Sequence, residues 1–165
     1  MFDKARLERI RERLIDNNET ITVAESVTSG LMQCAFSQAK DASCFFEGGI
    51  TVYQLGQKTK HLDVEPVHAE AVHMVSTKVS EQMALGALQM FCTDWAIAIT
   101  GFAARTDSNS ILYAYASIAF RNKIVRTDRI VSDKEDGWET QVYFTTETLR
   151  LLDDCLTEKY AAVPK

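Results

Sequence analysis

The sequence lacks the features that a disulfide framework, a metal centre or a membrane span would need. Its four cysteines are scattered with no C-x-x-C pair, and its three histidines lie within residues 61–73 at no metal-ligand spacing. We therefore expect free thiols in a reducing compartment, no metal and no cofactor. No apolar stretch reaches the roughly 18–20 residues of a membrane helix, and the charged amphipathic start has no signal-peptide apolar region. These absences predict a cytoplasmic protein without membrane contact.

Basic residues are also fewer than acidic ones. The chain has 18 Lys and Arg against 23 Asp and Glu, a net charge of −5, and no basic tract. Nucleic acid is therefore not an expected partner. A length of 165 residues suits one domain with a real core and is too short for two ordinary ones. With 46% apolar and 25% charged residues, the composition predicts a single globular domain over residues 1–165.

Hydrophobic periodicity predicts alternating helices and strands. Helices are predicted at about 3–16, 28–39, 66–72, from 76 onward, and 138–160. Strands are predicted at about 21–24, 50–53, 95–99, 111–120 and 124–131, the last two forming an antiparallel hairpin. This order indicates an α/β fold, a single-domain three-layer α/β/α sandwich with a mixed β-sheet.

The most informative segment runs from Ile21 to Gly30. Its apolar run stops at Glu25-Ser26, and a cluster of hydroxyl residues then leads to a glycine. This layout places Ser26 at the carboxyl end of a strand and the amino end of a helix, where open α/β sheets bind ligands and helix N–H groups attract anions and oxyanions. A serine before a helix is otherwise an N-cap. Residues 53–58 and 100–105 form two further loops at strand ends.

A serine hydroxyl becomes a good nucleophile only when a base takes its proton. No Ser-His-Asp set is evident in the sequence, which leaves lysine as the other option, because a partly desolvated lysine holds its proton weakly. Lys58 could be this base, and Tyr53 could relay a proton or hydrogen-bond a substrate group. Each also fits a structural role, Lys58 as a solvated helix residue and Tyr53 as a tyrosine that packs its ring.

Five segments, in order and at matching spacing, resemble the CinA C-terminal domain family, the nicotinamide-nucleotide amidases. The string Thr22-Val-Ala-Glu-Ser-x-Thr-x-Gly30 resembles the family's T-x-A-E-S-C-T-G-G. The other four segments resemble W-F-x-x-G, T-Y-x-N-x-x-K, M-A-x-G-A-L and S-G-I-A-G-P, and they lie at residues 45–49, 52–58, 83–88 and 99–103. The resemblance covers nearly the whole chain.

The resemblance implies a specific reaction. Family members hydrolyse the carboxamide of nicotinamide mononucleotide to nicotinic acid mononucleotide and ammonia, without a metal. It implies Ser26 as nucleophile, Lys58 as base and Tyr53 beside them, a small nucleotide-like substrate, and a homo-oligomer. The candidate substrate-binding residues are Glu25, Thr28, Ser29, Gly30, Thr100, Gly101, Arg105 and Lys134. Thr28 and Gly30 would bind an anion or oxyanion, and Thr100 with Gly101 would line the opposite wall.

Several substitutions fall in the loops that would hold the substrate. Ser29 replaces a glycine, and Gly101–Ser108 lacks three glycines and a proline of the family loop. Lys134 and Trp138 stand where the family has arginines, and only a guanidinium grips phosphate with two fixed donors. Arg105 either compensates or is a solvated loop residue. The alternative function is therefore a catalytically inactive or substrate-shifted paralogue that acts as a small-molecule-binding or regulatory protein.

Overall fold

The computed structural model describes residues 2–105 and 110–161. In chain order, the elements are α1 (Lys4–Asp16), β1 (Ile21–Glu25), α2 (Leu31–Ser37), η1 (Ala42–Cys44, a 3₁₀ helix), β2 (Phe46–Thr51), α3 (Leu55–Leu62), α4 (Pro66–Ala71), α5 (Thr77–Phe91), β3 (Trp95–Gly101), β4 (Leu112–Phe120), β5 (Lys123–Ser132) and α6 (Gly137–Ala161). None of the helices in the described ranges combines the length and the apolar character that a membrane crossing requires.

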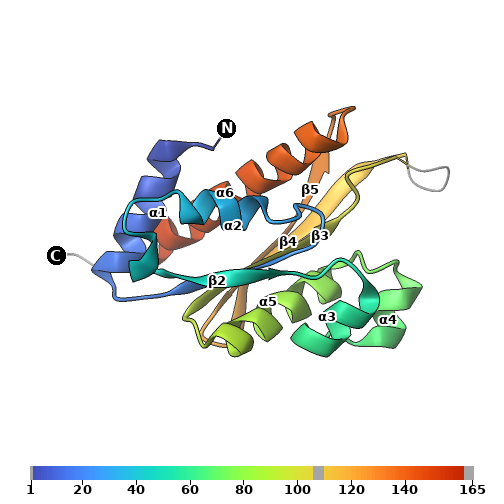
Figure 1. Ribbon diagram of the computed structural model, residues 1–165, viewed down its shortest axis with the longest axis horizontal. Coiled ribbons are helices and arrows are strands. Elements are labelled where there is room, and N and C mark those ends of the chain that lie inside the picture. The colour runs from blue at the N-terminus through green and yellow to red at the C-terminus, as the bar shows by residue number, and fades with distance from the viewer. Residues whose placement is uncertain (1, 106–109, 162–165) are drawn as a thin grey trace.

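The described strands form one five-stranded mixed sheet. Its order is β2-β1-β3-β4-β5, with β1 parallel to both of its neighbours and with antiparallel β3–β4 and β4–β5 pairs. Helices α1, α2 and α6 lie on one side of this sheet, and α3, α4 and α5 lie on the other (Figure 1). The predicted three-layer α/β/α architecture with a mixed sheet is confirmed.

The central strand β3 places its large side chains in the core on one face of the sheet and its alanines in the core on the other face. Trp95, Ile97 and Ile99 belong to the core beneath α1, α2 and α6, whereas Ala96 and Ala98 belong to the core beneath α5. Because successive side chains on a strand point to opposite faces, this alternation gives one core the large side chains of β3 and the other core its alanines. Ala96 and Ala98 pack in one core with Val79, Met83 and Ala87 of α5.

Three predicted boundaries were wrong. Strand β2 is Phe46–Thr51 rather than 50–53, because its two glycines pair in the ladder with β1 although they lack the usual strand side chains. Helix α2 begins at Leu31 rather than 28, because Ser29 and Gly30 have φ angles of 50° and 100°, which a helix does not accommodate. Residues 53–58, predicted as a loop, enter helix α3, so Lys58 is a helical residue.

Helix α3 packs closely against α5 at Gly86. A Cβ atom at Gly86 would lie 2.3 Å from the carbonyl oxygen of Leu62, closer than van der Waals contact allows. The missing side chain therefore permits the last turn of α3 to rest on the backbone of α5. Lys58 and Leu62 are both buried and lie four residues apart, on one face of α3. The contact at Gly86 thus holds the face of α3 that directs Lys58 into the protein.

We expect Gly86→Ala to lower the free energy of unfolding by about 1–3 kcal/mol, because the added methyl group overlaps backbone atoms that cannot move independently. Gly56→Ala in α3 is the matched control, since nothing lies within 4 Å of a Cβ built there. The control should gain about 0.5–1 kcal/mol from higher helix propensity. Urea unfolding of both variants checks this prediction, and equal stability of the Gly86→Ala variant and the parent would contradict the proposed packing constraint.

Candidate active site

A cavity opens where the carboxyl ends of β1 and β3 meet helix α3 and the start of α6. Its volume is about 410 Å³. Its lining residues are Ser26, Val27, Tyr53, Lys58, His73, Met74, Val75, Thr100, Gly101, Phe102, Ala103, Ala104, Gly137 and Gln141. This is the crevice in which open α/β folds bind ligands, as the position of Ser26 in the sequence predicted.

Ser26 and Lys58 are in direct contact at the base of this cavity. Lys58 Nζ lies 2.8 Å from Ser26 Oγ, although 32 residues separate them in the sequence. The Ser26 N–H donates to the Ile99 carbonyl oxygen at 3.1 Å and so ties the serine to β3. Lys58 is fully buried and Ser26 is 7% exposed. The nucleophile–base pair expected from the resemblance therefore has hydrogen-bonding geometry.

The ammonium group of Lys58 has uncharged partners. Besides Ser26 Oγ, Nζ donates to the carbonyl oxygens of Val52 at 2.6 Å and Tyr53 at 3.3 Å. Burial removes water from the charged form, and no carboxylate contacts Nζ in the described part of the chain to offset this cost. Burial therefore lowers the pKa of Lys58 from 10.5 to about 8. A solvated surface lysine, which is the alternative for this residue on its sequence alone, is excluded.

The cavity lining beside this pair includes Tyr53, Thr100 and Gly101. Their contacts within the protein are as follows. Tyr53 reaches Lys58 through its carbonyl oxygen, and its side chain is 62% exposed at the cavity mouth. The Thr100 hydroxyl donates to the Met74 carbonyl oxygen at 2.8 Å, so it holds the wall of the cavity. Gly101 packs against β4, where a Cβ would lie 2.5 Å from the Tyr113 carbonyl oxygen.

Glu25, Thr28 and Gly30, which were expected to bind substrate at the start of α2, hydrogen-bond with one another and lie outside the lining of the cavity. The buried Glu25 carboxylate already occupies that position: it accepts the N–H groups of Gly30, Met32 and Gln33 at 2.9–3.1 Å and the Thr28 hydroxyl at 2.6 Å. These donors satisfy the carboxylate, and the carboxylate caps the helix. Their effect on the site is to hold the backbone that follows Ser26.

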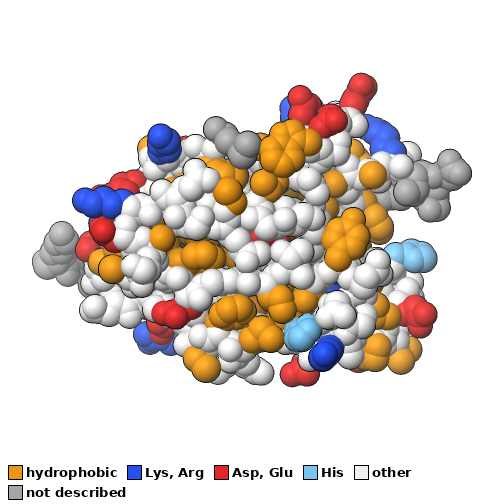
Figure 2. All heavy atoms as spheres, in the orientation of Figure 1, with side chains coloured by type: hydrophobic (Ala, Val, Ile, Leu, Met, Phe, Trp, Pro, Cys, Tyr) orange, Lys and Arg blue, Asp and Glu red, His pale blue; other side chains and the backbone are white. Residues whose placement is uncertain are grey.

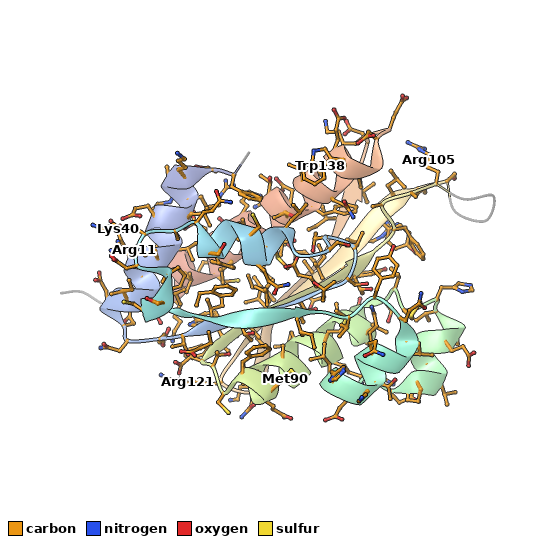
Figure 3. The ribbon with its side chains drawn as sticks, in the orientation of Figure 1. Arg11, Lys40, Met90, Arg105, Arg121 and Trp138 are labelled. Atoms are coloured by element: carbon orange, nitrogen blue, oxygen red, sulfur yellow. The ribbon has the colours of Figure 1, made fainter. Side chains whose placement is uncertain are left out.

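Three other candidates also lie outside the lining of the cavity. Ser29 is exposed and its hydroxyl donates to the Ser26 carbonyl oxygen at 3.4 Å. Arg105 is exposed at the outer edge of the molecule, where it donates to the Ser110 carbonyl oxygen at 2.8 Å (Figure 3). Lys134 lines a different hollow with Trp138 and forms an ion pair with Asp133 at 3.6 Å.

Gln141 is a site residue that sequence reasoning missed. From α6, its side-chain amide donates to the Val27 carbonyl oxygen at 2.8 Å and so fixes the peptide that follows the serine. Gln141 and Val27 are 114 residues apart, so no local pattern could reveal this contact.

Sequence reasoning also missed His73 and Met74. Both line the cavity, and their φ angles are 52° and 64°, a conformation that non-glycine residues rarely adopt.

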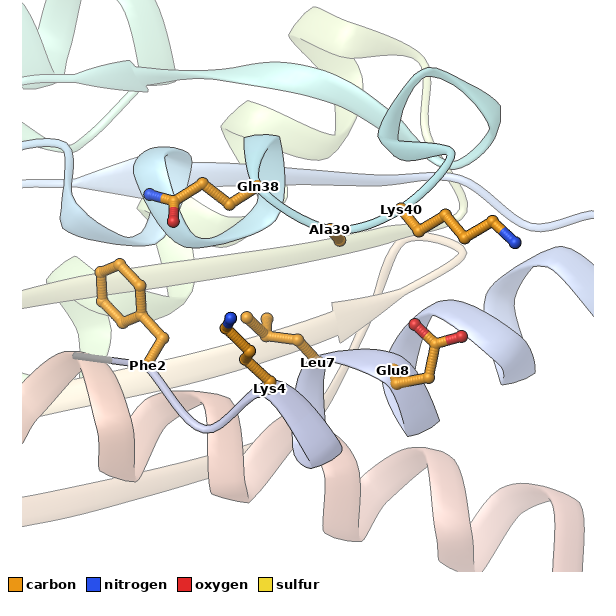
Figure 4. A pocket seen from close by; sticks show the side chains of 7 residues that line it. All are labelled: Phe2, Lys4, Leu7, Glu8, Gln38, Ala39 and Lys40. Carbon is orange, nitrogen blue, oxygen red and sulfur yellow. The ribbon is translucent and has the colours of Figure 1, made fainter.

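A second cavity, of about 640 Å³, lies between the start of α1 and the end of α2 (Figure 4). Its lining residues are Phe2, Lys4, Leu7, Glu8, Gln38, Ala39 and Lys40. It holds no nucleophile beside a base. Within residues 2–105 and 110–161, no group of three His, Cys, Asp or Glu side chains could hold a metal ion. The smaller cavity with Ser26 and Lys58 is therefore the candidate active site.

Proteins with related sequences are CinA-like proteins. One from Chlorobium chlorochromatii is 33% identical over 161 residues, which is 94% of this chain and 37% of that protein. One from Mycolicibacterium vanbaalenii is 32% identical over 143 residues, 84% of this chain and 33% of that protein. One from Rippkaea orientalis is 36% identical over 109 residues, 64% of this chain and 26% of that protein. The chain thus spans about a third or less of the length of these curated relatives.

Solved structures share the fold. A competence-damaged protein (CinA) superfamily protein from Klebsiella pneumoniae matches with a TM-score of 0.83 at 24% identity, covering 94% of this chain and 98% of that one. A competence or damage-inducible protein from Enterobacter asburiae matches with a TM-score of 0.85 at 21% identity, covering 94% and 99%. The family model of the CinA C-terminal domain matches residues 3–156, and this chain therefore belongs to the CinA C-terminal domain family.

Proposed function

We propose that the chain is an amidohydrolase in which Ser26 attacks a substrate carboxamide and Lys58 is the general base. The observation that carries this proposal is the 2.8 Å contact between Ser26 Oγ and Lys58 Nζ at the base of a cavity. The family resemblance implies the carboxamide of nicotinamide mononucleotide as the reference substrate, with nicotinic acid mononucleotide and ammonia as products.

The hydrogen-bond partners of Lys58 suit a neutral amine that acts as a base. A neutral amine has two N–H donors and one lone pair. The two donors match the carbonyl oxygens of Val52 and Tyr53, and the lone pair then faces the hydroxyl hydrogen of Ser26. A pKa near 8 leaves part of the population in this form at neutral pH, which is what general-base catalysis requires.

The reaction proceeds through an acyl-enzyme in two balanced halves. Lys58 takes the Ser26 proton while Oγ bonds to the amide carbon, and the carbonyl becomes an oxyanion. When the C–N bond breaks, Lys58 returns that proton to the leaving nitrogen, which departs as ammonia. Lys58 then takes a proton from water as the water oxygen attacks the ester, and the proton returns to Ser26 Oγ as the carboxylic acid leaves.

Two backbone groups are available to stabilise the oxyanion. The N–H groups of Val27 and Thr28, which directly follow the nucleophile, form no hydrogen bond within the described residues. Gln141 holds the Val27 carbonyl oxygen and so fixes the orientation of the peptide that carries the Thr28 N–H. Donors that are fixed before the reaction stabilise developing charge without a reorganisation cost. Gln141 is therefore a positioning residue in this proposal.

A second candidate is a protein that binds such a molecule without hydrolysing it. Two observations favour this candidate. Arg105 and Lys134 lie outside the described cavity lining, so the phosphate contacts expected from them are missing there. The N–H groups at the start of α2 already donate to the Glu25 carboxylate. This candidate predicts that ligand raises the melting temperature of the parent protein while no ammonia is released.

We expect the parent protein to release ammonia from a panel of nicotinamide-type carboxamides and Ser26→Ala to lose at least 1000-fold of this activity, since the nucleophile is removed. Ser37→Ala is the matched control, an exposed serine on α2 outside the cavity lining, and it should retain full activity. A folded parent that releases no ammonia at micromolar concentration would contradict the hydrolase and favour the binding protein.

The rate should depend on pH through Lys58. Only the neutral amine is a base, so kcat/KM should rise about tenfold per pH unit below pH 8 and level off above about pH 9, following the pKa of about 8. Lys58→Met should abolish turnover at every pH, whereas the exposed neighbour Lys60→Met should leave the profile unchanged. A flat rate between pH 6 and 9 in the parent would exclude Lys58 as the base.

A further inference from the structure

We propose that strand β5, at the free edge of the sheet, pairs antiparallel with β5 of a second copy of this chain. The two-fold axis passes at Thr127, and Arg126 of each copy lies opposite Asp128 of the other copy. This inference does not depend on the proposed amidohydrolase activity. It follows from the position of β5 in the sheet, the direction of its backbone groups and the order of its charges.

Strand β5 has a strand neighbour on one side only. The order β2-β1-β3-β4-β5 makes β2 and β5 the edge strands of the described sheet (Figure 1). β5 has 10 residues and β2 has 6, so β5 is the longer edge. An edge strand carries a row of N–H and C=O groups that its own sheet does not use, and these groups can pair with a strand of another molecule.

One hydrogen bond shows which way the backbone groups of β4 point. The Phe102 N–H donates to the Tyr113 carbonyl oxygen at 2.9 Å, so Tyr113 directs its backbone groups toward β3. The backbone groups of successive residues in an antiparallel strand point alternately to its two sides. The odd-numbered residues of β4 therefore bond to β3, and its even-numbered residues bond to β5.

The register of β4 with β5 then identifies the free groups of the edge. Even-numbered residues lie opposite even-numbered ones, as Ala116 lies opposite Asp128. The even-numbered residues of β5 from 126 to 132 therefore use their backbone groups toward β4. The groups that point to the open side belong to Thr127, Arg129 and Val131. A second strand would bond to these three residues.

The charges of β5 suit pairing with another β5. Arg126 and Asp128 flank Thr127, and the Arg126 guanidinium donates to Asp128 Oδ2 at 3.0 and 3.2 Å. Their side chains are 30% and 36% exposed, so a partner can reach them. In an antiparallel pair centred on Thr127, residue 126 lies opposite residue 128 on both sides of the axis. Arginine then faces aspartate twice, and such opposite-charge pairs stabilise neighbouring strands.

Other registers lack this complementarity. A pair centred on Arg129 would place two guanidinium groups opposite each other, which opposes pairing. A pair centred on Val131 would extend past Ser132, where β5 ends. On the other side, the ladder with β4 shifts register and leaves Val125 without a partner, so the regular strand begins at Arg126. Residues 126–128, which form the centre of the proposed pair, lie within this regular part.

The other edge strand does not offer such a pattern. β2, Phe46–Thr51, contains two glycines and a single charged residue, Glu47, so pairing with itself would bring no opposite charges together. β2 crosses the side of the molecule seen in Figure 2, and charged side chains are scarce across the middle of that side. Charged residues on an edge usually discourage strand pairing. On β5 their signs alternate about Thr127, and this order favours a second copy over an unrelated strand.

A charge-swap series measured by sedimentation equilibrium tests the proposal. We expect a monomer–dimer equilibrium for the parent, and a dissociation constant at least about tenfold higher for Arg126→Asp and for Asp128→Arg, because each makes two like-charge pairs. The double variant with both changes should return to within about threefold of the parent, since opposite charges again face each other. A parent that stays monomeric at every soluble concentration would overturn the proposal, and so would a double variant as weak as the single ones.

Two controls show whether charge at β5 is responsible. Lys78→Asp makes the same change of charge on α5, where Lys78 is exposed and pairs with Glu65 at 3.8 Å, and it should leave the dissociation constant unchanged. Raising the salt concentration should weaken the parent dimer, because exposed ion pairs are screened. A dimer that is insensitive to salt, or that Lys78→Asp weakens as much as Arg126→Asp does, would contradict the proposed pairing.

A backbone variant tests the strand pairing itself. Thr127→Pro removes the free N–H group at the axis, and proline is tolerated on an edge strand where that group faces outward. Thr127→Val is the matched control, because it also loses the hydroxyl contacts with Ser117 and Glu81 at 3.0 Å but keeps the N–H group. We expect Thr127→Val to dimerise and Thr127→Pro to remain monomeric. Equal dimerisation of the two folded variants would show that the interface lies elsewhere; if circular dichroism shows Thr127→Pro to be unfolded, the charge-swap series decides alone.

Discussion

The site depends on the burial of one amine. Lys58 is fully enclosed, and its partners in the described residues are a hydroxyl and two carbonyl oxygens. Such an environment favours the neutral form of the amine, which lowers its pKa and makes it a base for Ser26. Burial is imposed by packing, because α3 rests on α5 where Gly86 leaves room for the Leu62 carbonyl. A structural contact thus determines the protonation of a reactive group.

A second constraint concerns negative charge at the start of α2. In many α/β proteins such a helix end binds a ligand phosphate. Here the Glu25 carboxylate takes the donors, and in return it holds the turn that carries Ser26. Gln141 restrains the same turn from the other side through the Val27 carbonyl. The turn is therefore fixed by internal groups, and the cavity beside it keeps aromatic walls and few cations.

The fold and the central pair of the site could be predicted from sequence, but the surroundings could not. Buried strands such as Trp95–Ile99 and the long helix α6 leave strong local patterns. The family motifs indicate Ser26 as the nucleophile and Lys58 as the base, but they do not show the contact between the two side chains. Arg105 and Lys134 were expected to bind substrate and lie outside the lining of the cavity, because a charged loop residue has no local pattern that fixes its direction. Gln141 had no sequence signal at all.

The sequence by itself determined the α/β class, the family and the identity of the serine and the lysine, because periodicity and motif spacing are properties of the chain alone. Only the tertiary structure decided that Lys58 is buried beside Ser26, that the Glu25 carboxylate accepts the N–H groups at the start of α2, and that Gln141 holds the Val27 carbonyl oxygen. These facts depend on desolvation and on contacts between segments far apart in sequence. Solvation and long-range contact arise only when the chain is folded, so the chemistry of the site is a property of the fold.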